Sequence, residues 1–348
     1  MADFPTSIYE ERETENLPGI VFDANKKQNL YSEDFQNHAS EITAIETYLK
    51  SGSVVNGIFQ VNSALPVTGN VNMLVCNSQY IFITGGSSNR IYKYDIATLT
   101  KQGETASYGY NILSLYANDI HIFFSGAFTF QVRKCLISDM SFVADSASYT
   151  GIVYAITGNA THIFIGGQTL KKVRKILISD MSTVADSADY GGTIYALSAN
   201  ATHLFVGGAT TQIVRKILIS NMSTVVDSAN FGGVVRTILL DSLNFYVGGE
   251  TVYSIKKYLI SDMSLVLTSS VFARPNYKIE FWGNYVVLGS GTSFGITIIN
   301  KTTMQYVCCG LISAANDVSL AVLDNYVYSI DSYQNSIKKY LIGTIQVI

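Results

Sequence analysis

Three histidines recur at one position of an internal repeat and are the first candidates for chemistry. His121, His162 and His203 are evenly spaced along the chain, and imidazole is a common zinc ligand. A zinc ion needs its ligands to converge within about 2.1 Å, whereas equivalent positions of stacked repeats are spread along the array. Tyr80 and Asn244 hold the same position in other copies. The pattern therefore favours a duplicated structural position, and we expect no metal site and no cofactor.

Basic residue pairs recur in the same repeats. They are Arg133-Lys134, Arg174-Lys175, Arg215-Lys216, Lys256-Lys257 and Lys338-Lys339. A hairpin that turns about Asp139-Met140 sets Lys134 opposite Asp145. The same arrangement in the next copies sets Lys175 opposite Asp186 and Lys216 opposite Asp227.

Opposite charges across a strand pair stabilise a sheet by about 0.2–1 kcal/mol and discourage edge pairing. We therefore expect these basic pairs to be structural. The alternative is a ring of cations that binds an anionic glycan. Its residues would be Arg133, Arg174, Arg215 and Lys256.

Other polar motifs give no catalytic signature. The Ser-Asp-Met-Ser segments hold single aspartates in tight turns, which is typical of Asx-turns rather than calcium sites. Paired carboxylates, a Ser/His/Asp set, a phosphate loop and a zinc cluster are missing from the sequence. The four cysteines lack metal spacing, and Cys135 stands where other copies place Ile176 and Ile217, so it should be a core residue. We expect a protein that binds by its surface and is not an enzyme.

All of these residues belong to one repeat. Gly126, Gly167, Gly208 and Gly249 mark its constant spacing in four successive copies. One copy contains four short runs rich in Val, Ile, Tyr, Phe and Thr, separated by turn residues. Four strands in a period of roughly 40 residues predict a β-propeller blade. The blades should start near Val71, Asn111, Ile152, Thr193, Val234, Tyr277 and Asp317, which makes seven.

The sequence also indicates how the ring closes. Residues 57–64 resemble the fourth strand of an internal copy but precede the first blade. We predict that Ile58 to Ser63 completes the blade that begins at Asp317. The tail Thr344 to Ile348 is the competing segment for that place. Residues 57–348 should thus form one all-β, seven-bladed propeller.

Composition excludes several classes of protein. The net charge is −3 and 14% of residues are charged, so no basic surface for nucleic acid is indicated. No apolar run approaches the roughly 18 residues of a membrane span, so we expect no membrane insertion. The first residues lack the basic and apolar regions of a secretory signal, so we expect the protein to be made without a signal peptide.

Residues 1–56 differ from the rest and should form an extended arm with one short α-helix. Ser32 offers an N-cap, and the helix should run to about Lys50. Its apolar residues are spaced as an a/d seam of about two heptads. They are Phe35, Ile42, Ile45 and Leu49. This seam either packs on the chain's own propeller or joins copies of the chain.

The segment that contains this helix resembles the N-terminal segments of tail-fibre and baseplate-associated proteins of tailed bacteriophages. The matching elements are Pro18-Gly19 with Phe22-Asp23, Tyr31 to Phe35, and Glu41 to Glu46, and the resemblance is confined to residues 17–50. It implies a structural protein of the virion tail, made in the host cytoplasm. It further implies that the arm docks on another tail protein or on sister copies, most often as a homotrimer, and that the propeller meets the host surface.

A second reading places the chain in a cell as a WD40-like or kelch-like interaction scaffold. The Gly-Gly after the second strand is similar to kelch repeats, but the kelch Tyr and Trp pattern and the WD dipeptide are missing. The docking-like leader favours the virion reading, since a scaffold has no need of it.

Overall fold

The computed structural model describes residues 54–64, 71–85, 88–270, 272, 276–290, 296–310, 319–331 and 336–346. Residues 57–343 form a compact unit. Within the described residues all regular structure is β-strand. The helix predicted for residues 32–50 lies outside them.

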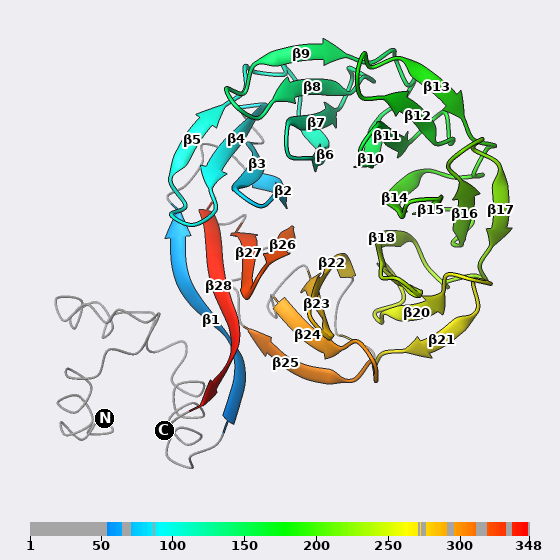
Figure 1. Ribbon diagram of the computed structural model, residues 1–348. Helices are drawn as coiled ribbons and strands as arrows, with labels where there is room; N and C mark the ends of the chain where they lie inside the picture. The colour runs from blue at the N-terminus through cyan, green and yellow to red at the C-terminus, as the bar shows by residue number, and fades with distance from the viewer. Residues whose placement is uncertain are drawn as a thin grey trace. The chain divides into compact units, whose positions relative to one another are not determined.

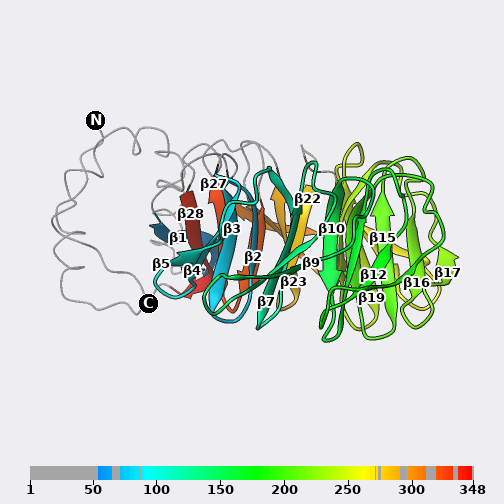
Figure 2. The same ribbon diagram turned by 90° about the horizontal axis from the view of Figure 1, so that it is seen from above.

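The strands form seven four-stranded sheets arranged as a ring (Figure 1). This confirms the predicted seven-bladed β-propeller. Seen from its edge, the ring of blades is a disc whose strands run across its thickness (Figure 2). The inner strand of each blade contacts the inner strands of the neighbouring blades around the whole ring, including β2 with β26.

The bounds of the strands follow the repeat. The inner strands are β2 (Val71–Cys76), β6 (Ile112–Ala117), β10 (Val153–Gly158), β14 (Ile194–Ala199), β18 (Val235–Leu240), β22 (Asn276–Trp282) and β26 (Leu320–Leu323). The second strands are β3 (Tyr80–Gly85), β7 (His121–Gly126), β11 (His162–Gly167), β15 (His203–Gly208), β19 (Asn244–Gly249), β23 (Tyr285–Ser290) and β27 (Tyr326–Asp331).

In most copies the third and fourth strands of a blade are shorter than its first and second strands. The third strands are β4 (Arg90–Asp95), β8 (Arg133–Leu136), β12 (Arg174–Leu177), β16 (Val214–Leu218), β20 (Lys256–Leu259), β24 (Ile296–Asn300) and β28 (Ser336–Gln346). The outermost strands are β5 (Lys101–Glu104), β9 (Phe142–Asp145), β13 (Thr183–Asp186), β17 (Thr224–Asp227), β21 (Leu265–Thr268), β25 (Tyr306–Gly310) and β1 (Val54–Ala64).

The ring closes with strands from both ends of the chain. The last sheet has the order β1-β28-β27-β26, so β1 is the outermost strand of a blade whose other three strands come from the C-terminal end (Figure 1). This confirms that the segment around Ile58 to Ser63 completes the last blade. The competing residues Thr344 to Gln346 instead prolong the third strand of that blade.

The hydrophobic core lies between neighbouring blades. In one cluster Phe164 of the third blade packs with Leu204 and Ile217 of the fourth, and all three side chains are fully buried. The same kind of cluster joins Leu74 of the first blade to Ile330 of the last. Burial of one such side chain stabilises the fold by roughly 1.5–3 kcal/mol, so each blade is stable mainly through its neighbours.

The repeated glycine at the end of each second strand has a steric cause. A Cβ added to Gly167 would lie 1.9 Å from the carbonyl oxygen of Ile152, and one added to Gly208 would lie 1.9 Å from that of Thr193. At this point the inner strand carries a β-bulge, since Val153 pairs with Gly167 but Ala155 pairs with Gly166. The glycine therefore makes room for a bulge at the start of the inner strand.

The Ser-Asp-Met-Ser segments are Asx-turns, as predicted. Asp139 Oδ1 accepts a hydrogen bond from the Ser141 amide at 2.9 Å, and Asp180 accepts one from Ser182 at the same distance. Met140 has a φ of 62° and is buried, so the turn places an apolar side chain into the core. Cys135 is buried as well, in agreement with its predicted core position.

Candidate functional site

The basic pairs are divided between two structural tasks. The predicted pairing of lysine with aspartate is wrong, because the partner of each aspartate is the arginine: Arg133 lies opposite Asp145 and Lys134 lies opposite Ala144. Cys135 pairs with Phe142, so the hairpin turn is centred between Ser138 and Asp139 and not at Asp139-Met140. A bulge after Lys134 then shifts the pairing by one residue, which places Arg133 opposite Asp145. The same shift occurs in the next two blades.

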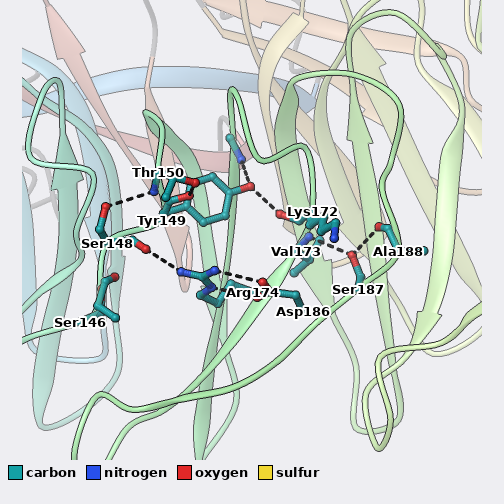
Figure 3. Close-up of polar contacts among 12 residues, drawn as sticks. Ser146, Ser148, Tyr149, Thr150, Lys172, Val173, Arg174, Asp186, Ser187 and Ala188 are labelled. Carbon is teal, nitrogen blue, oxygen red and sulfur yellow. Dashed lines mark hydrogen bonds and ion pairs between the residues drawn. The ribbon is translucent and has the colours of Figure 1, made fainter.

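Each arginine makes a bidentate ion pair within its own blade. Arg174 Nε lies 2.8 Å from Asp186 Oδ1, and its Nη2 lies 3.0 Å from Oδ2 (Figure 3). Its third nitrogen, Nη1, donates to the carbonyl oxygen of Ser148 at 2.7 Å. The guanidinium also lies 5.8 Å from the centre of the Tyr149 ring. Arg174 therefore ties the third and fourth strands to the loop that leads into its blade.

The other predicted anion-binding residues occupy equivalent places. Arg133 and Arg215 make the same bidentate pairs with Asp145 and Asp227. Lys256 instead donates to the Phe231 carbonyl at 2.7 Å. Each of the four cations belongs to a different blade and already has a partner there. Binding of an anionic glycan by them stays a prediction.

The lysine of each pair reaches the next blade. Lys134 Nζ lies 2.7 Å from the carbonyl oxygen of Ile178 and 3.2 Å from that of Ser179, and the side chain is 3% exposed. Burial lowers the pKa of this amine, partly offset by Asp180. Equivalent contacts join five further pairs of blades. We call the six residues the inter-blade lysines: Lys93, Lys134, Lys175, Lys216, Lys257 and Lys339.

The inter-blade lysines also cross the closure of the ring. Lys339 of the last blade donates to the carbonyl oxygens of Ile96 and Ala97 in the first blade, at 3.4 and 3.3 Å. In the sixth blade, Ile298 takes the register position of the lysine. Since a buried ammonium is stable only with acceptors, each lysine holds its neighbour's turn in place.

A serine and a tyrosine complete the repeated contacts shown in Figure 3. Ser187 Oγ accepts from the Val173 amide at 2.9 Å and donates to the Ala188 carbonyl at 2.8 Å. The Tyr149 hydroxyl donates to the Lys172 carbonyl and accepts from the Gly167 amide. The bonds of Ser187 give the serine of the recurring Asp-Ser-Ala sequence a structural role.

The three histidines start the second strands of their blades. His162 Nδ1 lies 2.8 Å from Thr161 Oγ1, and His203 makes the same contact with Thr202. Burial lowers the pKa of each imidazole, and the nearby inter-blade lysine lowers it further. Within the part of the chain that the structure describes, no group of three or more His, Cys, Asp and Glu side chains is placed to hold a metal ion.

A different set of residues lies at the starts of three adjacent inner strands. Tyr154, Tyr195 and Arg236 are the second residues of the inner strands β10, β14 and β18, and each is the extra residue of a β-bulge. The residues on either side of each one are buried, while the three themselves are partly exposed. A bulge commonly redirects a side chain in this way.

The three side chains contact one another across adjacent blades. The rings of Tyr154 and Tyr195 are 5.1 Å apart between centres and inclined at 50°. The Arg236 guanidinium lies 4.0 Å from the centre of the Tyr195 ring, and its Nη2 lies 2.7 Å from Glu250 Oε1. Tyr154, Tyr195, Arg236 and Glu250 are named the bulge cluster below.

Two polar groups of the bulge cluster lack a short hydrogen bond to the described residues. Arg236 Nε is buried and has no hydrogen-bond partner among the described residues. The Tyr154 hydroxyl lies 3.4 Å from Gln168 Oε1, which is at the limit of a hydrogen bond. Burial raises the pKa of Tyr154, and Tyr195 raises it further, so its hydroxyl stays a donor at neutral pH.

Sequence reasoning missed the bulge cluster. In the four copies of the strict repeat the second position of the inner strand holds Leu113, Tyr154, Tyr195 and Arg236, whereas its neighbours stay apolar or small. Variation at one position of an otherwise retained repeat is the signal that could have identified it. The predicted docking residues lie outside the described residues: Pro18, Phe22, Phe35, Ile42, Ile45 and Leu49.

A membrane-spanning helix is not found in the part of the chain that the structure describes.

No family model and no curated protein matches the sequence. The chain is similar in fold to the WD40 β-propeller domain of Doa1, with a TM-score of 0.72 and 11% identity over 82% of this chain and 97% of that one. It is also similar to the computationally designed Ika8 protein, with a TM-score of 0.66 and 13% identity over 82% of this chain and all of the other. These similarities establish the fold as a WD40-like, seven-bladed β-propeller.

Proposed function

We propose that the chain is a non-enzymatic attachment protein. In this role the propeller presents a binding surface, and residues 1–56 anchor the chain to a larger assembly. The observation that carries the proposal is that repeated and variable residues of the repeat have different roles. The repeated Arg, Lys, Asp and Ser side chains hold strands and blades together, as in Arg174 and Lys134. Tyr195 and Arg236, which hold the same repeat position with different side chains, contact each other on adjacent blades.

The resemblance of the leader to phage tail proteins supports a more specific place for the chain. The assembly would be the tail of a bacteriophage particle, and the propeller would meet the host surface. The neighbours of the leader would be another tail protein and sister copies, arranged as a homotrimer. The residues that make these contacts in the proposal are Pro18, Phe22, Phe35, Ile42, Ile45 and Leu49.

Purified particles test this placement. Mass spectrometry of such particles should find the chain together with capsid and tail proteins. The double substitution Ile42→Asp and Ile45→Asp should remove it from particles while its far-ultraviolet circular dichroism stays unchanged. Leu243→Asp, at a side chain that is 69% exposed on the propeller, is the matched control and should be incorporated normally. Incorporation of the double variant at the normal level would contradict the proposal.

A cellular interaction scaffold is the second candidate, and the fold similarity to a WD40 domain favours it. The scaffold would bind protein partners by its propeller and would have no need of the leader. Recovery of the chain with cellular proteins but never with particles, and with residues 1–53 dispensable for that recovery, would favour the scaffold.

A further inference from the structure

The bulge cluster has the composition of a small-ligand site. Ligand sites combine aromatic surface with a few placed polar groups, and tyrosine provides both at a low cost in side-chain entropy. Tyr154 and Tyr195 come from adjacent blades, and the Arg236 guanidinium lies 4.0 Å from the centre of the Tyr195 ring. Tyr195 is therefore contacted by both of its neighbours, and the partly exposed Tyr154 is the aromatic ring that the cluster offers to a ligand.

The charges of the cluster compensate each other. Arg236 and Glu250 form an ion pair with an Nη2–Oε1 distance of 2.7 Å, and their side chains are 27% and 30% exposed. A paired guanidinium and carboxylate present donors and acceptors side by side without a net charge. Such a pair suits neighbouring hydroxyl groups, because each hydroxyl both donates and accepts.

The Nε of Arg236 is buried and has no hydrogen-bond partner among the described residues, so it lies beneath the surface that a ligand would touch. The aromatic faces carry negative electrostatic potential and attract polarised C–H groups. Hydroxyl oxygens and polarised C–H groups occur together on the faces of a sugar ring.

We propose that the bulge cluster binds a neutral saccharide. The sugar ring stacks on Tyr154, and its hydroxyls bond to the exposed parts of Glu250 and of the Arg236 guanidinium. The inference deepens the proposed attachment function and rests on it for its biological meaning. A neutral sugar is favoured over an anionic one because Glu250 offsets the charge of Arg236. It is favoured over a basic peptide because Glu250 is already paired.

Ligand-detected NMR and calorimetry on the full chain test the inference. The probes are the methyl glycosides of glucose, galactose, mannose and N-acetylglucosamine, with glucuronate and sialic acid as anionic probes and oligolysine as a basic peptide. At least one neutral glycoside should bind at millimolar concentration. Tyr154→Ala and Arg236→Ala should each weaken that binding at least tenfold.

Tyr110→Ala is the matched control, because Tyr110 is a 46% exposed tyrosine whose ring centre lies 5.8 Å from that of Phe128, outside the cluster. It should leave binding unchanged. The conservative variants Tyr154→Phe and Glu250→Gln separate stacking from hydrogen bonding: the first should keep most of the affinity and the second should lose it. Thermal melting identifies any variant that has lost its fold.

Three results would overturn the inference. They are no binding of any neutral glycoside, equal binding by the wild type and Tyr154→Ala, and stronger binding of an anionic sugar or of oligolysine. Failure of the attachment proposal is distinguishable from these. If the chain is missing from particles yet binds a neutral glycoside through Tyr154, the placement fails and the sugar site stands.

Discussion

At the scale of single residues, neighbours in the sequence have different tasks. Arg133 and Lys134 are adjacent, yet the first pairs with an aspartate of its own blade and the second enters the junction with the next blade. Alternation along a strand sends consecutive side chains to opposite faces of the sheet. A repeated basic pair is thus one ion pair within a blade and one link between blades.

Removal of an inter-blade lysine should destabilise the ring. Lys134→Met keeps the apolar stem but removes the amine, which leaves the carbonyl oxygens of Ile178 and Ser179 without their donor. We expect a loss of about 1–3 kcal/mol in the free energy of unfolding, measured by urea denaturation. Lys171→Met, at an exposed lysine, is the control and should change it by less than about 0.5 kcal/mol. Equal stability of the two variants would contradict this role.

The histidines should make the fold sensitive to acid. Burial lowers the pKa of His121, His162 and His203 below the ordinary value of 6.5. Between the folded and unfolded pKa values the unfolded chain binds more protons, so the free energy of unfolding falls as the pH drops through 6.5.

The triple substitution of these histidines by Asn, the residue that the fifth blade carries as Asn244, should reduce this fall. Thermal melting of the wild type and the variant between pH 7.5 and pH 5.5 measures it. The variant should lose less stability over this range than the wild type. Parallel curves would show that the histidines do not contribute.

At the scale of elements, one glycine and one bulge act together. Gly208 is the last residue of its second strand, and the carbonyl oxygen of Thr193 leaves no room there for a Cβ. The β-bulge at the same point directs Tyr195 out of the sheet. The spacing of the glycines is therefore tied to the geometry of the bulge cluster. The repeat that builds the blade also creates the positions at which blades can differ.

Gly208→Ala should damage both stability and the site. Its Cβ would lie 1.9 Å from the Thr193 oxygen, so the strand or the bulge must move. We expect a loss of more than about 2 kcal/mol, measured by denaturation, from the overpacking. Gly103→Ala is the control, since its Cβ would meet nothing closer than Met140 Cγ at 3.4 Å. A Gly208→Ala variant as stable as Gly103→Ala would disprove the steric role.

At the scale of the whole molecule, stability depends on closure of the ring. The first and last blades share a hydrophobic cluster and the contact of Lys339 with Ile96, and the N-terminal strand β1 pairs with β28 in the last blade. A blade is stable mainly through its neighbours, so loss of one junction exposes two apolar faces. The strand β1 reinforces this junction with backbone hydrogen bonds.

Deletion of β1 should open the ring. A chain that begins at residue 65 lacks the outermost strand of the last blade, whereas a chain that begins at residue 54 retains it. We expect the first to melt several degrees lower than the second and to aggregate through the exposed edge of β28. Light scattering and thermal melting of the two chains measure this. Identical melting temperatures would show that the ring closes without β1.

The four-stranded blade, the number of blades and the closing strand could all be predicted from the sequence. These features depend on the constant spacing of the repeat, on runs such as HIFIGG at Gly167, and on the likeness of residues 57–64 to an internal fourth strand. All three are local or repeated patterns, which sequence comparison within one chain detects directly.

Which side chains meet depends on the tertiary structure. The turn is centred one residue earlier than predicted and a bulge follows Lys134, and together these place Arg133 instead of Lys134 opposite Asp145. A shift of one residue reverses the face of every side chain beyond it. Tyr154, Tyr195 and Arg236 belong to three successive repeats and touch only because adjacent inner strands lie side by side around the axis of the ring. Contacts between blades depend on the curvature of the closed ring, and no pattern within one repeat contains that information.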